Sequence, residues 1–110
     1  MRISPEHQSM KQHRYRITVE HLETSHGEVL SRDPLVFTAR NHDDLFEIVV
    51  RSRAITGLSN DDSAAMAIGL KLLSEIALEN RSHPLFSELH EPIREFITKL
   101  KKAHAASLAS

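Results

Sequence analysis

Hydrophobic and polar side chains alternate along two short stretches in the first half of the chain. The first stretch covers residues 13–22 and the second covers residues 35–40. β-branched and aromatic residues at a spacing of two are typical of strands with one buried face. The stretches are predicted to pair as an antiparallel hairpin joined by a long connection. The side chains expected to face inward are Tyr15, Ile17, Val19, Leu35, Phe37 and Ala39.

Three helices are predicted after this hairpin. We expect Asn41 to cap the first helix, which fades near Ala54. The second helix is predicted from Ser59 to about Asn80, and the third starts at Pro92, a residue suited to a first helical position. The predicted fold class is therefore α+β, in the order β-β-α-α-α, with the helices on one face of a small two-stranded sheet.

The second predicted helix is apolar around most of its circumference, which indicates burial from several sides. We expect Leu72, Leu73 and Ile76 to belong to the core, with Lys71 on a narrow polar strip. Gly69 costs about 1 kcal/mol relative to Ala inside a helix. Its presence predicts the close approach of another backbone.

The length of 110 residues fits one domain with one hydrophobic core. We expect residues 10–102 to form this domain and residues 103–110 to fray. Residues 1–9 offer one apolar side chain besides Met1 and no periodicity, so they are expected to lie outside it. Met10 directly precedes the first strand, which favours a translation start at that residue.

Composition narrows the function classes. The chain has no cysteine, three glycines and a net charge of −1, which excludes thiol chemistry and disfavours a glycine-rich phosphate loop. The same charge gives no general attraction to nucleic acid or to anionic membranes. No apolar run has the length of a signal peptide or a membrane span, and the cytoplasm is the predicted compartment. No cofactor is predicted.

Five strings of sequence, in order, resemble a family of short bacterial proteins catalogued only as a domain of unknown function. The resemblance covers roughly residues 10–102 and implies a bacterial cytosolic protein with no established activity. It carries over no catalytic or ligand-binding residue. The strings are HRYRITVE (13–20), NHDDLF (41–46), GLKLL (69–73), HPLF (83–86) and REF (94–96).

Histidine is unusually frequent, with eight residues. His13 and His21 stand at the two ends of the inward strand face, where His42 or His83 would be able to join them. Converging neutral imidazoles suit zinc or another borderline metal. However, no histidine pair has the spacing of three or four residues that brings ligands together on a helix. A metal-binding protein or enzyme, with a site near the sheet and the Asn41 turn, is therefore the alternative hypothesis.

No catalytic residue is predicted, because the acidic doublets 43–44 and 61–62 stand at helix starts, where the helix dipole explains them. The outward strand face carries Arg14, Arg16 and Arg40, the candidate binding surface. The aromatic residues of both strands point to the other face, which disfavours nucleic acid. A two-stranded sheet exposes two edges, so the leading hypothesis is a non-enzymatic module that forms a homodimer through the sheet or binds another protein.

Overall fold

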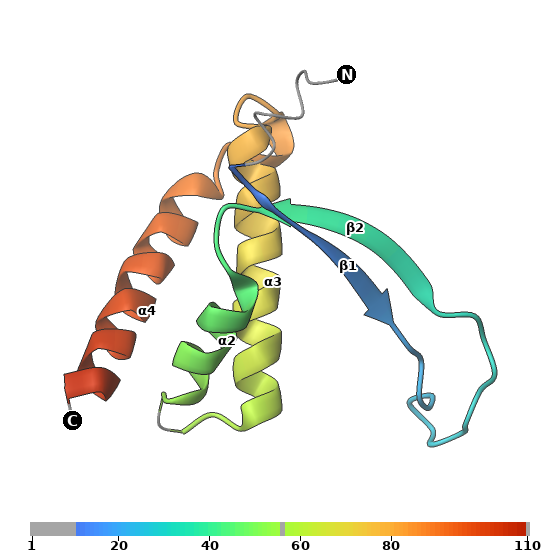
Figure 1. The fold of residues 1–110 in the computed structure, drawn as a ribbon. Coiled ribbons are helices and arrows are strands. Elements are labelled where there is room, and N and C mark those ends of the chain that lie inside the picture. Colours follow the sequence, from blue (N-terminus) through green and yellow to red (C-terminus); the bar gives the residue numbers. More distant parts are fainter. Residues whose placement is uncertain (1–10, 56, 110) are drawn as a thin grey trace, which may run out of the picture.

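The computed structural model describes residues 11–55 and 57–109 (Figure 1). Two antiparallel strands are followed by three α-helices and one short 3₁₀ helix, which confirms the predicted α+β class and the order of its elements. The elements are β1 (His13–Val19), β2 (Leu35–Asn41), α2 (Leu45–Arg53), α3 (Asn60–Glu79), η1 (Pro84–Phe86) and α4 (His90–Ala109).

The strands pair as expected, and their register defines two faces of the hairpin. Tyr15 lies opposite Ala39 and Val19 lies opposite Leu35, so the apolar side chains of both strands share one face. Residues 20–34 connect the strands. A turn closed by the bond from the Thr24 amide to the Glu28 carbonyl, at 2.7 Å, orders the middle of this connection. We call the hairpin and its connection, residues 13–41, the arm.

Helix α3 is the central element, with α2 and α4 beside it, and the arm leaves this helical body near the end of α3 (Figure 1). The far half of the arm stands away from the helices (Figure 1). Tyr15 and Ile17, near the base, are half-buried, whereas Val19 is 50% exposed and Leu35 is 62% exposed. The helices therefore cover the apolar face of the sheet only at its base.

The first helix is capped by a different residue from the one expected. Asp44 is the N-cap of α2, and its side chain accepts bonds from the amides of Phe46 and Glu47. Asn41 instead ends β2 and is buried. The expected role for Asn41 was wrong because the strand continues one residue further than the alternation indicates. For α3, Ser59 is the N-cap, as predicted.

The buried core is smaller than the pattern of α3 indicates. Among the described residues, the buried hydrophobic side chains are Leu45, Ala67, Ala77 and Leu100. The expectation that Leu73 and Ile76 lie in the core was wrong, because they are 41% and 49% exposed. Leu72 is half-buried. The neighbouring elements cover only part of the apolar circumference of α3, so much of that helix faces solvent.

Gly69 also departs from its expected role. A β-carbon added to Gly69 would have no neighbouring atom within 4 Å, leaving aside the backbone of its own helix. Among the described residues, no second backbone makes the close contact that was expected at this glycine. Gly27 and Gly57, in contrast, have φ angles of 83° and 97°. These angles lie in the left-handed region, which favours glycine.

Helix α4 extends beyond residue 102, the expected end of the domain, and continues to Ala109. A hydrogen bond of 3.2 Å between Ser52 Oγ and His104 Nε2 joins α4 to the buried side of α2. Burial lowers the pKa of His104, and the positive charges of Arg51 and Lys71 lower it further. Residues 1–9 lie outside the described residues. No helix in the described ranges is long and apolar enough to cross a membrane.

Candidate functional site

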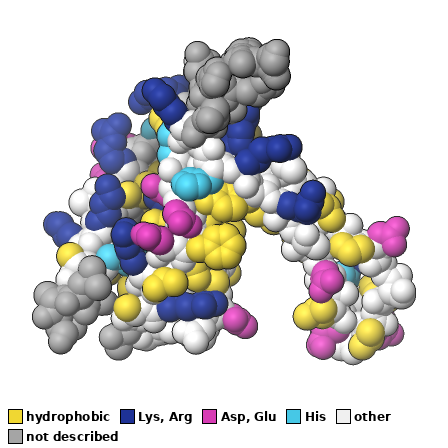
Figure 2. Space-filling model, in the orientation of Figure 1, with side chains coloured by type: hydrophobic (Ala, Val, Ile, Leu, Met, Phe, Trp, Pro, Cys, Tyr) yellow, Lys and Arg dark blue, Asp and Glu magenta, His cyan; other side chains and the backbone are white. Residues whose placement is uncertain are grey.

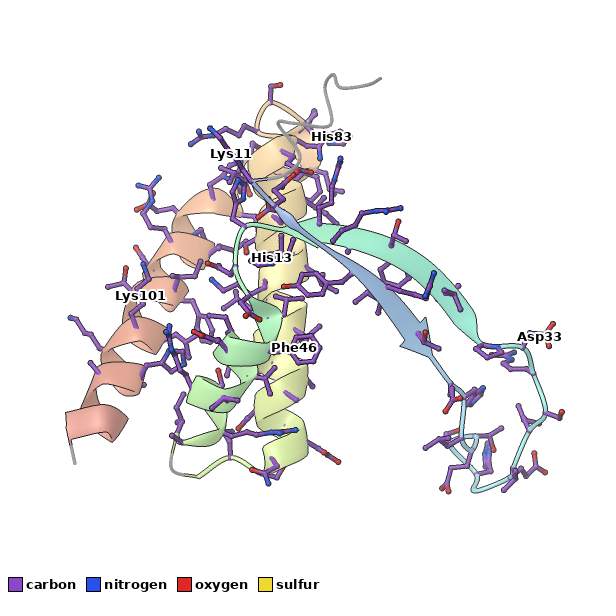
Figure 3. All side chains as sticks on the ribbon, in the orientation of Figure 1. Lys11, His13, Asp33, Phe46, His83 and Lys101 are labelled. Carbon is purple, nitrogen blue, oxygen red and sulfur yellow. The ribbon has the colours of Figure 1, made fainter. Side chains whose placement is uncertain are left out.

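Two of the candidate metal ligands lie at opposite ends of the arm. His13 lies at the base, where its ring centroid is 6.0 Å from that of Tyr15 (Figure 3). His21 belongs to the connection at the far end, where its Nδ1 lies 3.2 Å from the guanidinium of Arg32. The alternation correctly places His13 at a strand end, but the expectation for His21 was wrong, because β1 ends at Val19 and residues 20–22 belong to the connection.

The other two candidates take part in separate local contacts. His83 precedes η1, and its Nδ1 accepts a bond of 3.0 Å from the amide of Leu85. His42 follows β2, and its Nδ1 lies 2.6 Å from a carboxylate oxygen of Glu75. Within the described part of the chain, no group of three His, Cys, Asp or Glu side chains is placed to hold a metal ion. The geometry therefore gives the metal hypothesis no support.

A polar cluster at the base of the arm ties the hairpin to α3. The Glu75 side chain is only 8% exposed and lies between His42 and Gln12, both of which contact the same carboxylate oxygen. Gln12 also donates to Glu79 at 2.8 Å. The sequence carries no signal for this cluster, because Gln12 and Glu75 are 63 positions apart and share no motif.

A second set of contacts fixes the same junction from the β2 side. The Asn41 side chain donates to the Lys71 carbonyl at 2.8 Å and accepts from the Asp43 amide at 2.9 Å. The Lys71 ammonium lies 2.8 Å from the carboxylate of Asp43. The hydroxyl of Tyr15 donates to the Asp43 carbonyl and accepts from the Leu45 amide, both at 3.0 Å. These bonds connect the base of the arm to α2 and α3, so they set the direction in which the arm projects.

The candidate binding surface comprises three arginines of the strands, and one of them, Arg16, also lines the groove between the base of the arm and α2. Arg14 lies directly opposite Arg40 in the register, and Arg16 lies opposite Thr38. All three arginines are exposed. The register places Arg14 and Arg40 on the face opposite Tyr15, so aromatic side chains of the strands do not accompany these charges.

An apolar groove lies between the base of the arm and helix α2. Its volume is about 430 Å³, and its two charged lining residues are Arg16 and Arg53. Phe46, which is 75% exposed, extends from α2 on the side of the helices that faces the arm (Figure 3). Val50, on the same helix, is 67% exposed, so this apolar face of α2 is largely uncovered. The other lining residues are Tyr15, Ile17, Leu45, Phe46, Val49, Val50 and Ile68.

The far end of the arm, residues 20–34, combines acidic and apolar side chains. Leu22 and Val29 are 73% and 82% exposed. Figure 2 shows acidic and hydrophobic side chains intermixed over this end, and a hollow between the arm and the helical body. Within residues 20–34, Arg32 is the one arginine or lysine, and the four acidic residues are Glu20, Glu23, Glu28 and Asp33. The arm thus has an acidic, apolar end and a basic, apolar groove at its base.

Comparisons with known proteins identify relatives without an assigned activity. Residues 13–102 match the family model described as a domain of unknown function with a solved structure, DUF3861. A crystal structure of a protein of unknown function from Pectobacterium atrosepticum is similar, with a TM-score of 0.68 and 34% sequence identity over 82% of this chain and 97% of that chain. The search of curated proteins finds no match. The chain therefore belongs to the DUF3861 family, as the resemblance in its sequence indicated.

Proposed function

We propose that this protein is a non-enzymatic, self-associating module of the cytoplasm, and that the arm joins it to a second copy. The observation that carries the proposal is the exposed apolar face of the arm. Val19 and Leu35 lie opposite each other on this face, beyond the part of the sheet that the helices cover. A two-stranded sheet is marginally stable in water, and burial of its apolar face against a partner would stabilise it.

The helical body contributes further exposed apolar surface on the side that faces the arm. Phe46 and Val50 of α2, which both line the groove, are 75% and 67% exposed. Large apolar side chains grouped around a groove are typical of protein interaction sites and not of a free surface. Because one chain carries both the projecting arm and the groove, a second copy supplies a matching partner without any additional component.

Light scattering coupled to gel filtration, with the protein at tens of micromolar, tests the proposal. We expect a particle of twice the 12.5 kDa chain mass. The double variant Val19→Glu, Leu35→Glu places charges on the far half of the arm, where no helix covers the sheet, and should give a folded monomer. The matched control is Leu85→Glu on η1, a residue that is 73% exposed, and it should leave the dimer unchanged.

The result that contradicts the proposal is a wild-type particle with the mass of one chain. Circular dichroism of each variant shows whether its helices are retained, so that loss of the dimer is not confused with unfolding. If the wild type is a monomer and binds a different protein through the same arm, the partner of the arm is an unrelated protein and not a second copy. In that case the arm would be a binding surface, but self-association would be wrong.

A further inference from the structure

The far end of the arm and the groove at its base are complementary in chemistry. The end, residues 20–34, carries four acidic residues and one arginine, with Leu22 and Val29 exposed among them. The groove is lined mainly by apolar side chains, and its charged residues, Arg16 and Arg53, are both positive. An acidic, apolar segment and a basic, apolar groove match in both hydrophobicity and charge.

One chain cannot join its own end to its own groove in this conformation. The end of the arm, marked by Asp33, lies far from Phe46, which lines the groove (Figure 3). The strands between them are paired over seven residues each, and the polar contacts of Asn41 and Tyr15 fix the base. The groove is therefore open to an occupant from another molecule (Figure 2).

We propose that two copies clasp each other, with the end of each arm seated in the groove of the other copy. The inference rests on the proposed self-association and specifies its geometry. In such a pair the contact is made twice, related by a twofold axis, so the assembly closes as a dimer and does not grow into a filament. Leu22 and Val29 pack against Phe46 and Val50, and the acidic side chains lie beside the groove arginines.

The matched charges explain why a second copy is favoured over a generic apolar partner. Arg53 uses its Nε to donate to the Asn60 carbonyl at 3.4 Å, and among the described residues its terminal nitrogens have no hydrogen-bond partner. Arg16 is exposed on the arm itself. Complementary charges at the edge of an apolar contact fix its register and exclude like-charged partners.

A pair of charge-reversed proteins tests the clasp. The first carries Glu23→Lys and Glu28→Lys at the end of the arm, and the second carries Arg16→Glu and Arg53→Glu in the groove. In a homodimer of either variant, like charges face each other at both contacts. The dissociation constant of that homodimer should be about tenfold or more above the wild-type value. When the two are mixed in equal amounts, both contacts regain opposite charges, and a heterodimer of wild-type affinity should form.

The control is a mixture of either charge-reversed variant with a Leu85→Glu protein. In this mixture the altered arm end or groove of the variant still meets a like-charged surface, so that contact is not restored. As a measurement that needs no variant, the wild-type dimer should weaken as salt is raised, because exposed charges are screened. Two results would overturn the clasp while self-association stands: charge-reversed proteins that dimerise like the wild type, or folded variants whose mixture does not associate. A monomeric wild type would instead overturn the proposed function itself.

Discussion

Replacing Asn41 by Ala should loosen the junction between the arm and the helical body. The Asn41 side chain is 1% exposed and makes two hydrogen bonds, one to the Lys71 carbonyl and one from the Asp43 amide. Each bond contributes about 0.5–1.5 kcal/mol, and a half-buried amide left without its acceptor adds to the loss. The Lys71 carbonyl still accepts a bond from the Ser74 hydroxyl at 3.3 Å, so most of the cost falls on Asp43.

In total, the free energy of unfolding should fall by about 2–3 kcal/mol, because both hydrogen bonds are lost and the Asp43 amide is left without its acceptor. For a domain of this size, that loss lowers the unfolding midpoint by roughly 10 °C. Thermal unfolding followed by circular dichroism measures it directly. Asn41→Asp keeps the acceptor for the Asp43 amide but places a carboxylate oxygen against the Lys71 carbonyl. It should therefore lose at least as much stability as Asn41→Ala.

Asn80→Ala is the matched control, since Asn80 is exposed and its side chain donates a bond of 2.8 Å to the Ile76 carbonyl, which also accepts from the Asn80 backbone amide. Its loss should cost about 0.5 kcal/mol, the usual effect of a surface substitution. If Asn41→Ala and Asn80→Ala unfold within about two degrees of each other, the contact with Lys71 does not hold the arm in place. The same result would mean that the Asn41 side chain does not set the direction of the arm.

Three further predictions concern the helices. Leu45→Ala should lower the free energy of unfolding by about 2–5 kcal/mol, and Leu73→Ala should lower it clearly less, because Leu45 is 3% exposed and Leu73 is 41% exposed. Urea titrations of the monomer measure both losses, and equal losses would contradict this prediction. Gly69→Ala should raise stability by about 0.5–1 kcal/mol, since its β-carbon meets open space, whereas Gly57→Ala should lower it at a φ of 97°. The lowered pKa of His104 means that the unfolded chain binds a proton more readily, so stability should fall as pH drops below about 6.5. In His104→Gln the difference between urea midpoints at pH 7.5 and pH 5.5 should shrink, and an unchanged difference would show that another group causes it.

Local patterns along the chain were sufficient to predict the two strands, the three α-helices and their order. Alternation at a spacing of two marks β1 and β2, and their pairing follows because they are neighbours along the chain. Ser59 marks the start of α3 for a similarly local reason, because a cap bonds an amide only three residues away. The family resemblance also rests on strings of adjacent residues. These features depend on neighbours in the sequence, which is why pattern alone is sufficient for them.

Which apolar faces are covered, and which polar groups contact each other, follow from the packing of segments that are distant in the sequence. Glu75 is a charged residue on the predicted second helix, four positions after Lys71 of the polar strip, yet it is buried beside His42 and Gln12. Ile76 looks like a core residue, yet it is 49% exposed. Burial and pairing depend on the direction in which distant segments cross, and that direction is set by contacts such as Asn41 with Lys71, 30 residues apart. No periodicity along the chain encodes such contacts, because each joins elements whose separation in sequence is unrelated to their separation in space.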